Sequence, residues 1–140
     1  MNNEPESELA VRLQERGYNC AQAAACAFAR FIPVEEAHLY KLTEGFGGGM
    51  GDHHGTCGAV SGCIAIISLL HSNGDPSMTS KKSTYLLVDR LFERFRKRTG
   101  SSICKELLGE ETGIVLRSCQ GCVEDAVSIT SDILREEKLI

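Results

Sequence analysis

The sequence lacks a long apolar run, an excess of positive charge and a start typical of exported proteins. Its longest apolar run, from Ile64 to Leu70, is far too short to span a bilayer, so we expect no insertion into a membrane. The net charge of −4 and the pI near 5.6 give no electrostatic reason to expect a nucleic acid as partner. The first ten residues, MNNEPESELA, are acidic and polar and do not resemble an export signal. These absences predict a cytoplasmic protein.

Three further patterns are missing. No segment alternates apolar and polar residues over a useful length, so we expect few strands or none. The glycine-rich segment from Gly45 to Gly55 is not followed by Lys-Ser or Lys-Thr, which argues against a phosphate-binding loop. No pair of carboxylates stands out, and Asp52 beside His53 is too local a pair to indicate acid–base catalysis. The sequence therefore indicates no catalytic substrate and leaves open whether the protein is an enzyme.

Cysteine, in contrast, is abundant, with seven among 140 residues. Disulfide frameworks belong to small exported domains, and an odd number of cysteines without an export signal argues against one here. Reduced thiols, a bound metal or a redox role remain as explanations.

The order of apolar, capping and helix-ending residues predicts an all-α fold. With 140 residues, 42% of them hydrophobic, the chain is long enough for one domain with a sizeable core. We therefore expect a single compact helical domain over residues 1–140, a bundle of about six helices with a glycine-rich loop. The expected helical segments are 6–16, 20–32, 33 to about 44, 57 to about 71, 76–98, a short helix holding Cys104, and a last helix after Ser118.

Glycines are concentrated just before the helix expected at residue 57. Six of them fall between Gly45 and Gly55, which suits positive φ values or a close approach of the backbone to a bound group. The backbone positions expected to lie near a bound cofactor are Gly47, Gly48, Gly49 and Gly58. Gly58 and Gly62 share one face of the following helix, so we also expect close contact with the alanine-rich helix that begins at Cys20.

Four cysteines share a position at the start of an expected helix. Each follows a good N-cap residue: Cys20 follows Asn19, Cys57 follows Thr56, Cys104 follows Ser101 and Ser102, and Cys119 follows Ser118. Free backbone N–H groups and the positive end of a helix dipole would lower the pKa of each thiol. We expect folding to gather these four thiols into one site, where they bind a metal or act as redox-active thiols.

The remaining three cysteines receive less specific interpretations. Cys26 and Cys63 lie on apolar helical faces and are interpreted as small core residues. Cys122 completes a Cys119-x-x-Cys122 pair, which is a weak signal on its own. We keep Cys122 as an additional cysteine that could serve as a further metal ligand or as the second thiol of a pair.

Two adjacent histidines, His53 and His54, lie in the glycine-rich loop. We interpret both as polar loop residues. His54 is kept as an alternative metal ligand, because the spacing His54-x-x-Cys57 could chelate an ion.

Several pieces of the sequence together resemble one known family. They are Gly17-Tyr18-Asn19-Cys20-Ala21-Gln22, then Gly47-Gly48-Gly49-Met50-Gly51 leading into Cys57-Gly58-Ala59-Val60-Ser61-Gly62, then Gly100-Ser101 followed by Cys104, Leu107, Leu108 and Gly109, and finally Cys119 followed by Val123. In this pattern the chain resembles the C_GCAxxG_C_C family of redox-active proteins over nearly its whole length. The resemblance implies that the family's four cysteines are Cys20, Cys57, Cys104 and Cys119. It also implies a cofactor, because a related domain in larger electron-transfer proteins is associated with a [2Fe–2S] cluster.

Three functions from different classes remain. The first, which we favour, is electron transfer by an iron–sulfur cluster that the four thiolates hold. In the second, the cysteines cycle between thiol and disulfide without a metal. In the third, the same residues hold a structural zinc ion. We expect a redox partner protein, which the sequence does not identify, and a homodimer stays open.

Overall fold

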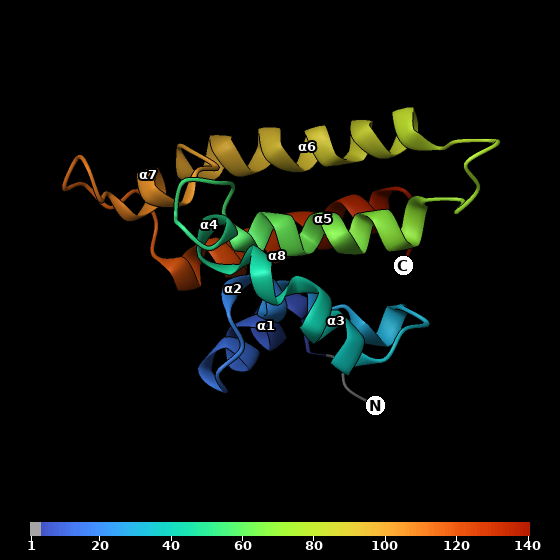
Figure 1. Cartoon of the computed structure of the whole chain (residues 1–140), viewed down its shortest axis with the longest axis horizontal. Helices are drawn as coiled ribbons and strands as arrows, with labels where there is room; N and C mark the ends of the chain where they lie inside the picture. The colour runs from blue at the N-terminus through green and yellow to red at the C-terminus, as the bar shows by residue number, and fades with distance from the viewer. Residues whose placement is uncertain (1–3) are drawn as a thin grey trace.

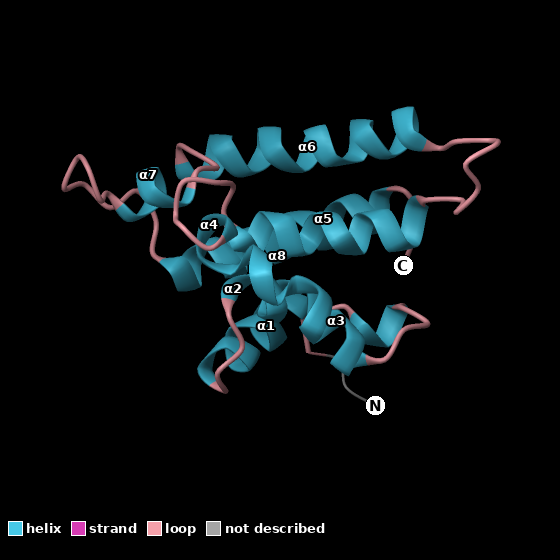
Figure 2. Cartoon of the chain, viewed as in Figure 1, coloured by secondary structure: helices cyan, strands magenta, loops and turns pink. Residues whose placement is uncertain are grey.

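The computed structural model describes residues 4–140, and this part of the chain is helical with no strand (Figure 2). The prediction of an all-α fold is confirmed. The first ten residues, in which we found no export signal, include residues 1–3, and these three lie outside the described residues. The described α-helices are α1 (Glu6–Glu15), α2 (Cys20–Cys26), α3 (Glu36–Thr43), α4 (Gly47–Met50), α5 (Gly58–His71), α6 (Lys81–Thr99), α7 (Cys104–Leu108) and α8 (Cys119–Glu136). Two 3-10 turns, η1 (Ala29–Phe31) and η2 (Glu44–Phe46), lie between them.

The three longest helices run side by side along the long axis of the molecule (Figure 1). These helices, α5, α6 and α8, contact one another in all three pairs. α2 packs against α5 and α1 packs against α8, so the first helices of the chain cover one side of this layer. α4 and α7 lie together at one end, opposite the turn that joins α5 to α6. None of the described helices is long and apolar enough to cross a membrane.

Every residue of α2 is buried, in keeping with its small side chains. The predicted helix over 20–32 is too long, because α2 ends at Cys26 and the chain reaches Ile32 through η1. A proline disfavours the helical conformation of the residue before it, and Ile32, before Pro33, is extended at φ −113° and ψ 130°. The next helix likewise begins at Glu36 and not at Pro33.

Two glycines let α5 lie close to α2. A Cβ at Gly62 would lie 2.4 Å from the carbonyl oxygen of Ala21, and one at Gly58 would lie 2.4 Å from the Sγ of Cys20. Neither distance is compatible with a side chain, so the predicted close contact between the two helices is confirmed.

α6 begins at Lys81, whereas the sequence predicted a start near Pro76. The segment before it is held in turns by its own side chains. Asn73 Oδ1 accepts a hydrogen bond from Asp75 N at 3.0 Å, and Asp75 Oδ1 accepts one from Ser77 N at 2.9 Å. Such local bonds compete with the helix for the same backbone N–H groups, which delays its start.

The hydrophobic core lies between these helices. Its largest fully buried side chains are Phe28, Leu39, Val60, Ile66, Ile67, Leu91, Phe95, Leu107, Val123, Ile129, Ile133 and Leu134. Cys26 and Cys63 belong to the core, as predicted, and burial raises the pKa of each thiol to about 12. These two thiols are therefore protonated core residues.

Candidate functional site

Five cysteines at the starts of four helices line one cavity of about 120 Å³. The lining residues are Cys20, Gly48, His53, Cys57, Gly58, Cys104, Leu107, Leu108, Cys119 and Cys122. The predicted gathering of four helix-start cysteines is confirmed as geometry. Cys122, which the sequence presented as an additional cysteine, belongs to the same cavity. All seven cysteines are free thiols.

A capping box places Cys20 at the start of α2. Asn19 Oδ1 accepts a hydrogen bond from Gln22 N, and Gln22 Oε1 accepts one from Asn19 N, both at 2.9 Å. Asn19 Nδ2 also donates to the carbonyl of Glu44 at 2.9 Å, which ties the helix start to η2. The predicted N-cap at Asn19 is confirmed. Because this cap uses Gln22 N, the N–H groups of Cys20 and Ala21 remain available to the Cys20 sulfur.

A short backbone pairing holds Cys57 and Cys104. Thr56 and Ile103 form an isolated antiparallel bridge. On either side of it, each cysteine N–H donates to a carbonyl of the other segment, at 2.7 Å for Cys57 and 3.0 Å for Cys104. The starts of α5 and α7 are therefore joined by main-chain hydrogen bonds.

This bridge also corrects two predicted N-caps. Thr56 is part of the bridge, so Cys57 itself is the N-cap of α5. The N-cap of α7 is Ile103, and neither Ser101 nor Ser102 caps that helix. Ser101 Oγ instead accepts a hydrogen bond from Ile103 N at 3.0 Å, before the helix begins.

Cys119 and Cys122 lie on the first turn of α8. Ser118 Oγ accepts a hydrogen bond from Gly121 N at 3.0 Å, which confirms Ser118 as the N-cap. Cys119 is exposed, and its sulfur accepts a hydrogen bond from Gln14 Nε2 at 3.4 Å. Cys122 is only 2% exposed. One turn of helix thus carries one thiol at the surface and one in the interior.

The glycine loop approaches the cavity closely. Gly48 and Gly58 line it, whereas Gly47 and Gly49 do not. Gly48 has φ +62° and Gly49 has φ +59°, a left-handed conformation that favours glycine. A Cβ at Gly49 would lie 2.4 Å from the Cβ of Cys104, so a side chain there would displace that cysteine. Cofactor binding by these glycines stays a prediction.

The sulfurs of Cys20 and Cys119 form the first of two pairs. A hydrogen bond from the Cys119 thiol lowers the pKa of Cys20 to about 6; burial opposes this shift, while the N–H groups of Gly48 and Ala21 favour it. The same hydrogen bond, burial and the charge on Cys20 raise the pKa of Cys119. At neutral pH the pair therefore holds one proton, on Cys119.

Cys57 and Cys122 form the second pair in the same way. A hydrogen bond from the Cys122 thiol lowers the pKa of Cys57 against the effect of burial, and the N–H groups of Ala59 and Val60 contribute. That hydrogen bond, burial and the charge on Cys57 raise the pKa of Cys122. Each pair thus combines a cysteine of lowered pKa with a thiol donor of raised pKa, and all four cysteines line one cavity.

Cys104 is the fifth thiol of the cavity. Burial and the charges of Cys57 and Cys20 raise its pKa to about 11, so it is protonated at neutral pH. The sequence grouped Cys104 with the other three helix-start cysteines. The structure instead pairs Cys57 with Cys122 and leaves Cys104 beside the two pairs.

His53, and not His54, lines the cavity. Its φ of +68° is unusual for a residue other than glycine, and its Nδ1 lies 2.5 Å from Glu110 Oε1. His54 contacts Asp52 at 3.3 Å, is two-thirds exposed and does not line the cavity, and its role as an alternative ligand stays a prediction. No local pattern in the sequence pointed to His53 as a cavity residue, because its partner Glu110 is far along the chain.

Among residues 4–140, no group of three or more His, Cys, Asp or Glu side chains is placed to hold one metal ion. A structural zinc site needs four ligands around one ion, so the arrangement does not fit the predicted zinc. A [2Fe–2S] cluster needs two ligands on each iron, and two pairs of thiols match that donor set in number and type.

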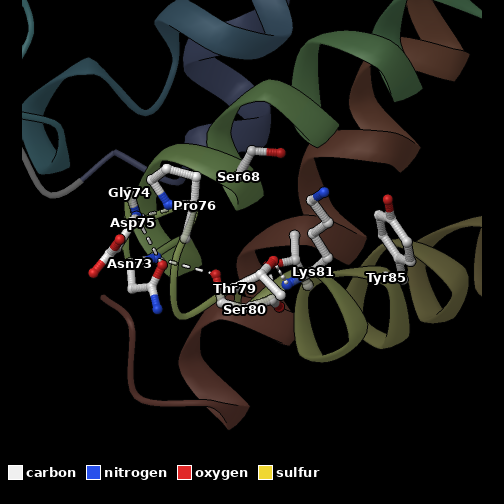
Figure 3. A pocket seen from close by; sticks show the side chains of 11 residues that line it. Ser68, Asn73, Gly74, Asp75, Pro76, Thr79, Ser80, Lys81 and Tyr85 are labelled. Atoms are coloured by element: carbon white, nitrogen blue, oxygen red, sulfur yellow. Dashed lines mark hydrogen bonds between the residues drawn. The ribbon is translucent and has the colours of Figure 1, made fainter.

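A larger hollow of about 260 Å³ lies at the far end of the molecule, beside the turn between α5 and α6 (Figure 3). Its polar groups bond one another, as when Asn73 N donates to Ser80 Oγ at 3.1 Å. No cysteine or histidine lines it. The cysteine cavity is therefore the better candidate for chemistry.

Sequence comparison decides the family. The profile of the family described as "Putative redox-active protein (C_GCAxxG_C_C)" matches residues 18–133. The chain belongs to this family. In this C_GCAxxG_C_C protein the match begins just before Cys20 and extends beyond Cys122, so it includes all five cysteines of the cavity. Comparisons with curated proteins and with solved structures give no match.

Proposed function

We propose that this protein carries out thiol–disulfide redox exchange at its two cysteine pairs. The observation that carries the proposal is the gathering of five cysteines around one cavity, where Cys119 lowers the pKa of Cys20 and Cys122 lowers that of Cys57. Exchange requires a thiolate and a second thiol that can close a disulfide with it, and the lowered pKa of one cysteine in each pair supports this role. Membership in a redox-active family supports the same kind of chemistry.

The first pair reacts with the disulfide RS–SR of a partner. The proton of the pair first passes from Cys119, the exposed member, to the Cys20 thiolate, and the Cys119 thiolate then attacks one sulfur of RS–SR and releases RS⁻. Cys20 then attacks the Cys119 sulfur of the mixed disulfide, and the second RS⁻ leaves with that proton as RSH. The cysteine pair is oxidised by two electrons, and RS–SR is reduced to RSH and RS⁻.

An iron–sulfur centre is the second candidate function, and the cysteine sulfurs that line the cavity favour it as possible ligands. Thiolates are the usual ligands of such clusters, and the helix-start N–H groups around the cavity would stabilise negative charge on them. Cys20, Cys119, Cys57 and Cys122 would hold the group in this arrangement, with Cys104 as the ligand implied by the family pattern. When bound, it would supply one-electron transfer.

One experiment separates the two forms. The full chain is purified anaerobically, its absorption spectrum is recorded, and iron, zinc and acid-labile sulfide are assayed. Its thiols are then counted before and after exposure to oxidised glutathione. We expect a colourless protein without stoichiometric metal that loses thiols two at a time.

Variants locate the chemistry. Cys20→Ser and Cys119→Ser should each abolish the disulfide of the first pair, whereas Cys26→Ser, in the core, should leave it unchanged. A brown protein containing iron and sulfide would select the cluster and overturn the exchange proposal. Full retention of all thiols under oxidant, without metal, would contradict both candidate functions.

Other expectations from the sequence belong to the same proposal. We propose that the chain is one domain that works in the cytoplasm with a redox partner protein. A homodimer stays a prediction.

A further inference from the structure

We infer that the two cysteine pairs form a relay, in which a disulfide made at Cys20–Cys119 is passed along the first turn of α8 to the Cys57–Cys122 pair. This inference rests on the proposed thiol–disulfide function and extends it. It assigns Cys122, which is not among the family's four cysteines, as the residue that carries the disulfide inward.

Burial distinguishes the two pairs. Cys119 is exposed, while Cys20 is 7%, Cys57 6% and Cys122 2% exposed. A protein disulfide can therefore meet the first pair through Cys119 but has no direct access to either sulfur of the second pair. Oxidising equivalents reach the second pair by way of the first.

The shared helix supplies the route. Cys119 and Cys122 are three residues apart on the first turn of α8, so their side chains are neighbours on one face. Both line the same cavity as Cys20 and Cys57. A Cys-x-x-Cys spacing is also the one that disulfide oxidoreductases use for exchange.

The relay needs two exchange steps. In the first, the Cys122 sulfur attacks Cys119 in the Cys20–Cys119 disulfide, its proton passes to the Cys57 thiolate, and Cys20 leaves as thiolate. In the second, the Cys57 sulfur attacks Cys122 in the Cys119–Cys122 disulfide, and Cys119 leaves with the proton from Cys57. The products are a Cys57–Cys122 disulfide and a reduced Cys20–Cys119 pair, so electrons and protons balance without any additional oxidant.

The wall of the cavity favours retention of the disulfide at the second pair. Leu107 is 1% exposed, and it lines the cavity together with Leu108. These apolar side chains keep water and external thiols away from Cys57 and Cys122. The second pair therefore stores two oxidising equivalents as a disulfide, and these reach a partner only through Cys119.

The test uses the reduced full chain, a small folded protein that carries one surface disulfide as oxidant, and acid quenching. Free thiols are alkylated after unfolding, and disulfides are mapped by peptide mass spectrometry over time. In the wild type the Cys20–Cys119 disulfide should appear first and the Cys57–Cys122 disulfide later. In Cys57→Ser, the chain should stop at a Cys119–Cys122 disulfide. In Cys119→Ser, the Cys57–Cys122 disulfide should not form although both of its cysteines are present.

Cys26→Ser is the matched control, because this core thiol lies outside the cavity and its variant should follow the wild-type time course. Formation of Cys57–Cys122 in Cys119→Ser at the wild-type rate would overturn the relay and leave the exchange function intact. Absence of any disulfide in the wild type would overturn the exchange function itself. Circular dichroism of each variant excludes loss of the fold as the reason for lost exchange.

Discussion

At the scale of single residues, the protein controls which sulfur carries each proton. Cys20 and Cys57 begin helices whose free N–H groups stabilise thiolates, and each thiolate takes a thiol as a further donor. Cys119 and Cys122 are those donors and keep their protons. The hydrogen bond from the partner thiol, with smaller contributions from helix-start N–H groups, therefore lowers the pKa of Cys20 and of Cys57.

The lowered pKa of Cys20 predicts how stability depends on pH. The folded state loses the Cys20 proton near pH 6, while an unfolded cysteine keeps it to about pH 8.5. Between these values the unfolded chain binds more protons, so the free energy of unfolding rises with pH, by at most about 1.4 kcal/mol per pH unit from this residue. Acidification through pH 6 removes the contribution.

Urea unfolding in the presence of a phosphine reductant, from pH 5 to 8.5, measures this slope. In Cys20→Ser the free energy of unfolding should rise less steeply with pH than in the wild type. The rise that remains comes from Cys57, whose pKa is lowered too. Equal slopes in the two proteins would show that folding does not lower the pKa of Cys20.

At the scale of elements, the distance between α2 and α5 sets the geometry of the first pair. Gly58 faces the Cys20 sulfur directly, and Gly62 lies against the Ala21 carbonyl one turn later. The helix that carries Cys57 can therefore lie against the helix start that carries Cys20. Cysteine chemistry here depends on residues that have no side chain.

Gly58→Ala tests this dependence. The new Cβ would lie 2.4 Å from Cys20 Sγ and 3.0 Å from the carbonyl oxygen of Phe46, so the helices must shift. We expect a loss of about 1–3 kcal/mol in the free energy of unfolding, typical of overpacking, and a higher pKa of the Cys20 thiol. Urea unfolding and the pH dependence of alkylation measure the two effects.

Gly45→Ala is the matched control, because a Cβ at Gly45 would have no neighbour within 4 Å. It should leave both stability and the thiol pKa near their wild-type values. An equal loss from both substitutions would mean that glycine content, and not the approach of α5 to α2, is what the fold requires.

At the scale of the whole molecule, a buried carboxylate joins distant parts of the chain. Glu6, at the start of α1, is 4% exposed and accepts hydrogen bonds from Arg30 at 3.1 Å and from Arg135 at 2.7 Å. Burial alone would raise the pKa of Glu6, but the hydrogen bond from Arg135 and the charges of both arginines lower it overall. The other end of α1 supplies Gln14 to the Cys119 sulfur.

Glu6→Gln should therefore weaken the fold without changing the thiol chemistry. Loss of the charged hydrogen bonds is expected to cost about 1–3 kcal/mol, measured by urea unfolding at pH 7. Glu136→Gln, which breaks the partly exposed pair with Arg94, should cost about 1 kcal/mol or less and serves as the control. A changed pKa of Cys20 in Glu6→Gln would show that α1 transmits strain to the site.

The sequence predicted the starts of α2 and α8 correctly and missed other helix boundaries. Asn19 and Ser118 cap their helices through contacts with residues three positions away, so a local pattern was sufficient. The end of α2 and the start of α6 depend on η1 and on side-chain turns, which shift boundaries by several residues. Thr56 failed as a cap because its partner Ile103 is distant in the sequence.

The composition of the cavity was predicted in part for the same reason. The four helix-start cysteines could be found because each follows a residue type that favours helix starts, although only Asn19 and Ser118 cap their helices. The pairing of Cys57 with Cys122, and the place of His53 opposite Glu110, depend on how α5, α7 and α8 pack. No spacing along the chain contains that information.

The bridge between Thr56 and Ile103 has one more consequence. It fixes the spacing of two sulfur-bearing segments through peptide groups alone, so this part of the frame around the sulfurs does not depend on the sulfurs themselves. In the proposed exchange, the starts of α5 and α7 would therefore keep their spacing while nearby sulfurs change between thiol and disulfide.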